Sequence, residues 1–248
     1  MSEEYVVELE HPSAKTFMTI LEALGNIVDE ALLNFTNEGV IVKALDPAKV
    51  SLIEIRLPPE AFLTFKVSKE LSVGMNLSSL IKSVAKPKKT EKLLFRASEE
   101  LYELVIEGVA VRRYKYRSVE VSATEVPEIS LDFKVKALVL AQAFKAAVKD
   151  LRGVGSIAFV VEDDQNLYLR AAEGGAEAKL SKMGGSILEL TVDEPSKCVY
   201  DEDYIAKILN LAGIAENLEI KFGNDLPLRL SFNLVDGGSV NYLLAPKA

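Results

Sequence analysis

The chain repeats its own apolar pattern at an offset of 127 residues, and this repeat limits its fold more than any other sequence feature. Four apolar residues with the i, i+3, i+4, i+7 spacing of a single helix face occur once in each half. They are Phe17, Ile20, Leu21 and Leu24 in the first half, and Phe144, Ala147, Val148 and Leu151 in the second. The match continues without a gap, because residues 37–44 fall on residues 164–171. Each half therefore predicts a helix, a strand, a polar turn and another strand, as expected for a duplicated domain.

The remaining segments extend this scheme in both halves. Residues 78–85 and 201–211 are predicted to form short second helices, and alternating apolar residues predict strands elsewhere. Between the halves, residues 118–133 contain Pro127 among alternating apolar residues, which indicates an extended connector lying over a surface. We therefore expect an α+β protein with helices on one face of mostly antiparallel sheets. The predicted domains are residues 1–117 and 134–248, joined by the connector 118–133.

Composition is typical of a folded, soluble protein. Hydrophobic residues make up 49% of the chain and charged residues 27%, which supports a sizeable core. No apolar run approaches the roughly 20 residues needed to cross a bilayer, and the polar start Met1-Ser2-Glu3-Glu4 is unlike a signal or transit peptide. The single cysteine, Cys198, excludes an internal disulfide and a Cys-rich metal site. An intracellular location, in cytoplasm or nucleoid, is expected.

The charge of the chain is unevenly distributed. A net charge of −8 and a pI near 5.0 argue against a nucleic-acid partner, because DNA affinity comes largely from basic groups. However, helices predicted at 13–24, 78–89, 141–152 and 201–211 hold nine basic and five acidic residues, out of chain totals of 29 and 37. Lys145, Lys149 and Arg152 form a stripe on one side of their helix. Ordinary solvation would explain one such helix, but the bias of all four together favours a basic surface.

The motifs of common enzyme classes are missing. The sequence contains no Gly-x-x-x-x-Gly-Lys-Ser/Thr phosphate loop, and its glycine pairs lack the strand-to-helix context of dinucleotide binding. His11 precedes the first helix beside Pro12, where a polar surface or capping role is expected. Cys198 lies in an apolar run and is expected to be buried and inert. The sequence therefore predicts neither an enzyme nor a cofactor.

The sequence also resembles a known family. Residues 45–52, Leu-Asp-Pro-Ala-Lys-Val-Ser-Leu, resemble the segment after the second strand of archaeal and eukaryotic DNA sliding clamps of the proliferating-cell-nuclear-antigen type. Residues 125–128 resemble the interdomain connector of that family, and residues 222–228 and 242–247 resemble its closing strands. These motifs occur in family order at family spacing, and the resemblance covers essentially the whole chain.

The resemblance implies a fold, an assembly and a function. Each subunit would contain two similar clamp domains with two helices packed on antiparallel sheet, and three subunits would close head to tail into a pseudo-sixfold ring. The ring would encircle double-stranded DNA without reading its sequence and act as a processivity factor. The implied partners are a DNA polymerase, a flap endonuclease, a DNA ligase and a clamp loader, bound through short motif peptides, and two further clamp subunits, identical or paralogous. No membrane partner is expected.

Three sets of residues follow from the basic stripe and the resemblance. The DNA-facing set is Lys15, Lys82, Lys86, Lys88, Lys89, Lys145, Lys149, Arg152 and Lys207. The partner-peptide pocket is formed by Leu45, Val50, Leu52, Val126, Pro127, Pro227, Leu243, Ala245 and Pro246. The subunit interface joins Val111, Arg113, Tyr114 and Lys115 to Glu177, Ala178, Lys179 and Leu180 of the neighbour, with Phe144, Val148 and Leu151 packing nearby.

Alternatives stay open for each set. The basic strand near residue 113 is also typical of an edge strand that charge protects against aggregation, and the pocket residues are also typical of plain core packing. Met18, Glu22 and Gly25 stand where the family usually places lysines, which predicts a weaker DNA contact there, and Leu243 stands where many relatives carry an aromatic residue. Two further hypotheses are therefore a specialised subunit of a mixed ring and a peptide-binding scaffold that does not encircle DNA.

Overall fold

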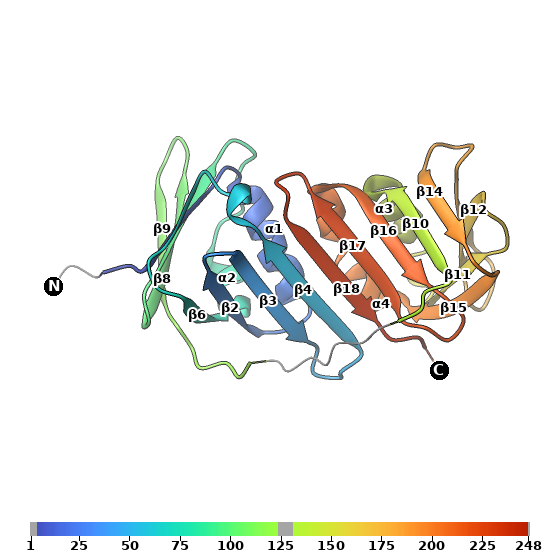
Figure 1. Cartoon of the computed structure of the whole chain (residues 1–248), viewed down its shortest axis with the longest axis horizontal. Coiled ribbons are helices and arrows are strands. Elements are labelled where there is room, and N and C mark those ends of the chain that lie inside the picture. Colours follow the sequence, from blue (N-terminus) through green and yellow to red (C-terminus); the bar gives the residue numbers. More distant parts are fainter. Residues whose placement is uncertain (1–3, 124–130, 248) are drawn as a thin grey trace. The chain divides into compact units, whose positions relative to one another are not determined.

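The computed structural model describes residues 4–123 and 131–247, which form two compact units (Figure 1). The first unit comprises residues 4–45, 53–123 and 236–239, and the second comprises residues 46–52, 131–235 and 240–247. The units are therefore not two continuous halves of the chain, since a short segment near residue 50 belongs to the second unit.

The first unit combines two antiparallel sheets with two α-helices. Its elements are β1 (Val7–His11), α1 (Ala14–Gly25), β2 (Glu30–Thr36), β3 (Gly39–Leu45), β4 (Ser51–Leu57), the 3₁₀ turn η1 (Pro59–Ala61), β5 (Thr64–Val67), β6 (Leu71–Asn76), α2 (Leu77–Ser83), β7 (Lys92–Ala97), β8 (Leu101–Glu107) and β9 (Arg112–Arg117). One sheet has the order β5-β1-β7-β8-β9, and the other strands follow the order β4-β3-β2-β6.

The second unit repeats this arrangement. Its elements are β10 (Val135–Leu140), α3 (Ala141–Asp150), β11 (Ser156–Val161), β12 (Asn166–Ala171), β13 (Glu177–Ser181), β14 (Ile187–Val192), β15 (Ser196–Asp201), α4 (Glu202–Ala206), the 3₁₀ turn η2 (Leu209–Gly213), β16 (Ala215–Phe222), β17 (Leu228–Leu234) and β18 (Ser239–Leu244). The strand orders are β14-β10-β16-β17-β18 and β13-β12-β11-β15, which match those of the first unit strand for strand. The predicted duplication and the α+β class are therefore confirmed.

In each unit a pair of aromatic rings on corresponding strands joins the two sheets. Phe35 of β2 stacks on Phe95 of β7 with ring centroids 5.1 Å apart, and Phe159 of β11 meets Phe222 of β16 edge to face at 5.9 Å. All four rings are at most 1% exposed. The apolar alternation of the strands therefore builds one core between the sheets of each unit, as period-2 burial requires.

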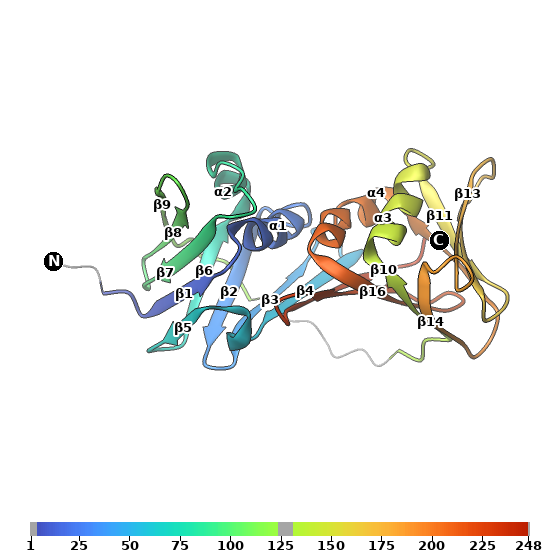
Figure 2. The ribbon, with the colours of Figure 1, turned by 90° about the horizontal axis from the view of Figure 1, so that it is seen from above.

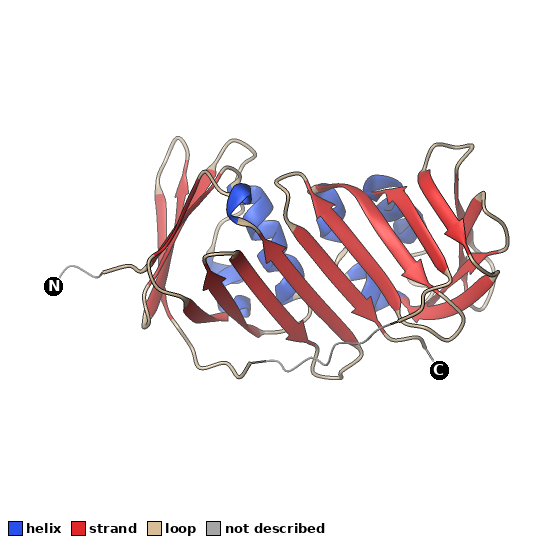
Figure 3. Ribbon diagram, viewed as in Figure 1, coloured by secondary structure: helices blue, strands red, loops and turns tan. Residues whose placement is uncertain are grey.

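The helices lie along one side of the strands in each unit (Figure 2). Helix α1 begins where the Ser13 hydroxyl accepts a hydrogen bond from the Thr16 N–H at 3.1 Å, which is an ordinary N-cap. Its buried residues include Phe17, Ile20, Leu21 and Leu24, the set that the periodicity predicts. Figure 3 shows how little of the chain is helical beside its many strands.

Two predicted helices are shorter than their sequence pattern. Helix α2 ends at Ser83, because Val84 is extended and Pro87 disfavours helical backbone at Lys86. Lys86, Lys88 and Lys89 therefore lie in the loop after α2 and not on a helix. Helix α4 ends at Ala206 and is followed by the 3₁₀ turn η2 at Leu209–Gly213.

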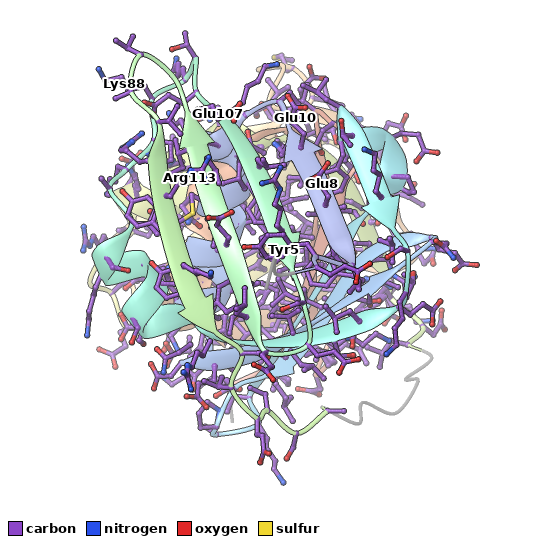
Figure 4. All side chains as sticks on the ribbon, turned by 90° about the vertical axis from the view of Figure 1, so that its left-hand side faces the viewer. Tyr5, Glu8, Glu10, Lys88, Glu107 and Arg113 are labelled. Atoms are coloured by element: carbon purple, nitrogen blue, oxygen red, sulfur yellow. The ribbon has the colours of Figure 1, made fainter. Side chains whose placement is uncertain are left out.

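The outward face of the β5-β1-β7-β8-β9 sheet is covered by ion pairs (Figure 4). Glu8 on β1 lies 3.0 Å from Arg96 and 3.6 Å from Lys66, and Glu10 lies 3.2 Å from Lys92. Alternating residues of β1 and β7 are buried, so the charged side chains occupy the opposite face of the pleat. The charged side chains of this face are therefore directed toward solvent.

His11 departs from its predicted surface role. The ring is 1% exposed, packs against Phe17 and Phe62, and places Nε2 3.0 Å from the Asp236 carboxylate. The expected surface position is therefore wrong, because a carboxylate partner offsets the free-energy cost of burying the ring. The capping alternative fits better, since His11 Nδ1 accepts a hydrogen bond at 3.1 Å from the N–H of Ser13, the residue that caps α1. Cys198 is buried, as predicted.

Candidate functional site

Helix α3 and the residues just after it present basic side chains on the flank beside the helix's core contacts. Ala141, Phe144, Ala147 and Val148 are buried. Lys145, Lys149 and Arg152 share one flank, because residues four and three apart lie on the same side of a helix. Lys149 and Arg152 are exposed, and Lys145 is half-buried. The amphipathic pattern that anchors α3 to the sheet thus also aims the basic stripe outward.

A cavity of about 280 Å³ opens beside this stripe, between α3, α4 and η2. It is lined by Lys145, Val148, Lys149, Arg152, Glu202, Ala206, Leu209 and Asn210. Glu202 is 4% exposed, and its carboxylate accepts a hydrogen bond from the Gly153 N–H at 3.1 Å. That bond fixes the turn that follows α3, where Arg152 stands. Three cations around one shallow hollow suit phosphate oxygens but do not select a base.

Lys207 follows α4 and is half-buried. Its ammonium nitrogen lies 4.0 Å from the centroid of the Tyr204 ring, a cation–π contact that holds the side chain against α4. Lys15 on α1 and Lys82 on α2 are exposed, as are Lys86, Lys88 and Lys89 in the loop after α2.

The predicted excess of positive charge on the helices is wrong as stated. Within their observed bounds the four α-helices contain four basic and four acidic residues. The excess lies in the segments directly after the helices, at Lys86, Lys88, Lys89, Arg152 and Lys207. In each unit the basic residues therefore stand at helix ends and in the loops that follow them, and those directly at a helix C-terminus also suit the helix dipole.

The structure explains why α1 lacks lysines at Met18 and Gly25. Met18 is 3% exposed and belongs to the core. A Cβ on Gly25 would overlap Cδ1 of Ile81, so this glycine allows α1 to pack closely against α2. These two positions serve packing in this chain and cannot carry a DNA contact.

Most residues of the predicted peptide pocket are neither core nor freely exposed. Val50, Leu52, Pro227, Leu243, Ala245 and Pro246 belong to the second unit, and all are half-buried. The Ala245 N–H donates to the Val50 carbonyl at 2.9 Å, which joins the C-terminal segment to the loop 46–51. Partly exposed apolar side chains favour a binding surface over plain core packing. Leu45 ends β3 in the first unit, and Val126 and Pro127 lie outside the described residues.

Asp46 shapes the loop 46–51, a role that the sequence interpretation missed. The carboxylate is 3% exposed and accepts hydrogen bonds from the Ala48 N–H at 3.0 Å and the Val50 N–H at 2.7 Å, as well as from Ser51. Burial raises the pKa of Asp46, but these hydrogen bonds and one from Tyr204 outweigh it and hold the pKa below its usual value. The sequence signal for this role is the Asp46-Pro47 pair, because aspartate commonly accepts hydrogen bonds from the backbone that follows it.

The start of the connector is docked along β6. The Val119 N–H donates to the Gly74 carbonyl at 3.0 Å, and the Gly74 N–H donates to the Ser118 hydroxyl at 3.1 Å. A Cβ on Gly74 would overlap the Val119 carbonyl oxygen, so only glycine allows this approach. The connector is thus held at its first residues by one backbone–backbone hydrogen bond and one bond to the Ser118 hydroxyl.

The predicted interface strands are the end strands of their sheets. Strand β9 ends one sheet of the first unit, and β13 ends one sheet of the second. Arg113, Lys115 and Glu177 are exposed, Tyr114 and Ala178 are half-buried, and Val111 is 59% exposed just before β9. On the other face of β9, the Tyr116 hydroxyl lies 2.6 Å from the Ser83 hydroxyl. Lys179 is exposed, whereas Leu180 is 4% exposed.

One part of the predicted interface needs correction. Phe144, Val148 and Leu151 are at most 1% exposed, because the apolar face of α3 packs in the core of its own unit. They support β13 from behind, since α3 contacts that strand, and they offer no surface to a neighbour.

The described residues show no features of a metal centre or a membrane span. Among them, no group of three or more His, Cys, Asp or Glu side chains is arranged to hold a metal ion. No helix in residues 4–123 or 131–247 is long and apolar enough to cross a membrane.

Comparison with known families places both halves of the chain. The family model for the N-terminal domain of proliferating cell nuclear antigen matches residues 6–132, and the model for the C-terminal domain matches residues 173–247. A DNA polymerase sliding clamp of Aeropyrum pernix is 33% identical over 94% of this chain and 97% of that protein. The DNA polymerase sliding clamp of Thermococcus onnurineus is 32% identical over 97% of this chain and 98% of that protein.

Solved structures share the fold over nearly the whole chain. A chain in the crystal structure of the PCNA2–PCNA3 complex from Sulfolobus tokodaii superposes with a TM-score of 0.88 at 29% identity, covering 97% of this chain and 99% of that chain. The crystal structure of PCNA from Thermococcus kodakaraensis also gives a TM-score of 0.88, at 27% identity, covering 97% and 100%.

Proposed function

The chain belongs to the proliferating-cell-nuclear-antigen family of DNA polymerase sliding clamps, and from this premise we propose that it is a subunit of a ring that encircles duplex DNA and tethers DNA polymerase. Three such subunits, each with two units of the same topology, would give the pseudo-sixfold ring. The chain would then serve replication inside the cell as a processivity factor. It would have no catalytic activity of its own, and a separate ATPase would load it.

The observation that carries this proposal is the placement of basic residues relative to the duplicated fold. In the second unit, Lys145, Lys149 and Arg152 gather at the helix side, around one hollow. In the first unit, the outward face of one sheet is neutralised by its own ion pairs. A protein that must slide needs weak, exchangeable phosphate contacts on one surface and little attraction for DNA elsewhere.

Ring closure would come from the two end strands. We propose that β9 of one subunit pairs with β13 of the next, so that each chain uses both edges once. Such a head-to-tail contact closes when its rotation suits the number of subunits. It would also cover edge strands that otherwise invite aggregation.

Partner enzymes would bind at the surface formed by the loop 46–51 and the C-terminal segment. Polymerase, flap endonuclease, DNA ligase and clamp loader would each insert a short peptide that carries a glutamine, an aliphatic residue and paired aromatic residues. The half-buried apolar side chains of Val50, Leu52 and Leu243 suit an aromatic plug.

Retention on circular DNA tests the proposal. The chain, with its clamp loader and any paralogous subunits, is loaded onto nicked circular duplex, washed at high salt, and the DNA is then cut once. A ring should stay on the circle and leave after linearisation, because topology and not affinity holds it. Loss from the intact circle, with peptide binding preserved, would instead identify a peptide-binding scaffold that does not encircle DNA.

A mixed ring is a second candidate, and one observation favours it. Strand β9 carries four basic residues and no acidic one, whereas β13 carries one of each. Within the chain Arg112 is paired with Glu91 and Arg113 lies 3.9 Å from Glu103, and the β13 strand of a second copy, with one acidic and one basic residue, adds little further charge complementarity. A paralogous subunit with an acidic β13 would fit better.

A further inference from the structure

The loop 46–51 is stabilised by its own Asp46 and also by Tyr204 of helix α4. The Tyr204 hydroxyl on α4 donates a hydrogen bond to Asp46 at 3.3 Å, on the same carboxylate that organises the N–H groups of the loop. Tyr204 is half-buried and Asp46 is 3% exposed, so the bond is shielded from water on the Asp46 side. The carboxylate thus links a helix of the second unit to the loop beside the predicted pocket.

Tyr204 is itself fixed by two neighbours. Its carbonyl accepts a hydrogen bond from the Tyr242 hydroxyl at 3.1 Å, which ties α4 to strand β18. Its ring lies under the ammonium group of Lys207 at 4.0 Å. Tyr242 directly precedes Leu243, and Val50 of the loop accepts from Ala245, so the same few residues connect α4, the loop and the C-terminal segment.

From this geometry we infer that Tyr204 is a positioning residue for the partner-peptide pocket. Its hydroxyl holds the loop 46–51, and with it Val50 and Leu52, in the conformation that meets the C-terminal segment. The inference rests on the proposed function, because it takes this surface to be where the peptide binds. Tyr204 would act through Asp46 and not by touching the peptide.

Peptide titration of Tyr204→Phe tests the inference. The probe is a synthetic peptide with a glutamine followed by aliphatic and paired aromatic residues, measured by isothermal calorimetry. Loss of one hydrogen bond to a carboxylate should weaken binding by about tenfold. Tyr168→Phe on β12 is the matched control and should bind as the unsubstituted chain does. Equal affinity of the unsubstituted chain and Tyr204→Phe for the peptide would overturn the inference but leave the proposed function standing.

A failure of the proposed function looks different. If the unsubstituted chain binds no such peptide, the peptide-binding part of the proposed function falls, and the inference falls with it. If the unsubstituted chain binds and both tyrosine variants lose affinity equally, the effect is not specific to Tyr204 and the inference is overturned.

The pH profile of peptide binding gives a readout that general loss of stability would not produce. The titratable groups around this bond are Asp46, Tyr204, Tyr242 and Asp201, with Lys207 on the Tyr204 ring. The pKa of Asp46 is lowered in the folded chain, so at any pH above that value the carboxylate is ionised and holds the loop. As the pH falls through the pKa, the carboxylate is protonated and the loop is released. Without the Tyr204 hydroxyl the pKa of Asp46 rises, so Tyr204→Phe should lose peptide binding at a higher pH. An unchanged midpoint would contradict the inference.

Discussion

At the residue scale, Asp46 fixes the loop 46–51 of the predicted partner surface, and Gly74 fixes the start of the connector along β6. Asp46 organises the loop 46–51 through backbone N–H groups, and Gly74 allows the connector to approach β6. Neither role follows from hydrophobic periodicity, because both depend on polar and close contacts with particular backbone groups. The Asp46-Pro47 pair is a local sequence signal for the first role, whereas the approach of Val119 to Gly74 joins residues far apart in the chain.

Asp46→Asn should lower the free energy of unfolding by about 1–3 kcal/mol at neutral pH, because an amide cannot accept from all the donors that face the carboxylate. The folded-state pKa of Asp46 is lowered, so the carboxylate contributes stability above its unfolded pKa, and this contribution is lost as pH falls through the folded pKa. Urea unfolding at several pH values should therefore show a shallower acid dependence in Asp46→Asn. Parallel acid profiles for the two proteins would argue against this role.

Gly74→Ala should destabilise the first unit by about 1–3 kcal/mol, because the added methyl group forces Val119 away from β6. Chemical denaturation followed by circular dichroism measures the effect. Gly213→Ala is the control, since a Cβ there meets no atom within 4 Å and its φ is not in the left-handed region. Equal stability of the two variants would show that the connector yields without cost.

At the element scale, long periodic segments were predictable and element ends were not. The offset of 127 residues places Ala14 on Ala141 and Gly39 on Asn166, and these residues begin α1, α3, β3 and β12 in the structure. The helix predicted at residues 78–89 is longer than α2, because Pro87 and the extended Val84 end α2 at Ser83. The apolar face of α3 was predicted, but whether it meets its own core or a neighbour was not readable from spacing.

Removing two cations beside the hollow tests the role of α3. Lys149→Ala combined with Arg152→Ala should reduce the slope of log K against log salt for duplex binding by about 0.9 for each phosphate that the double variant no longer neutralises. Fluorescence anisotropy with a labelled duplex measures the slope. Lys136→Ala combined with Lys197→Ala removes the same charge from exposed strand positions and should leave the slope unchanged. A similar fall in both variants would indicate attraction by net charge alone.

A proline at the β13 edge separates backbone pairing from side-chain contacts. The Lys182 N–H donates to the Gln165 carbonyl and the Ala171 N–H to the Ala176 carbonyl, so the N–H of Lys179 points away from β12. Lys179→Pro should therefore abolish ring assembly while the subunit stays folded, and Lys179→Ala should assemble normally. Size-exclusion chromatography with light scattering reports both. If Lys179→Ala also fails to assemble, the side chain and not the strand edge carries the interface.

At the scale of the whole molecule, both units of the chain share one topology, and the proposed ring would repeat this topology in every subunit. Each unit has the same strand order, and β9 and β13 are two of the strands that end a sheet, where we propose that one chain continues into the next. The fold class and family were predictable from the repeat and the motifs. The candidate DNA surface was predictable only in part, because its cations stand on loops whose place depends on where α2, α3 and α4 end.

Oligomer mass decides between a ring of one chain and a mixed ring. If β9 pairs with β13 of an identical chain, backbone hydrogen bonds provide most of the interface, and light scattering should give three times the 27.2 kDa of one chain at both low and high salt. If β9 instead requires an acidic edge, the purified chain should remain a monomer and assemble only with a paralogous subunit. That assembly should weaken as salt rises, since the screening length falls from about 10 Å at 0.1 M to about 3 Å at 1 M. The four basic residues of β9 give the mixed ring a charge that salt can screen, and a salt-independent trimer of this chain alone would exclude it.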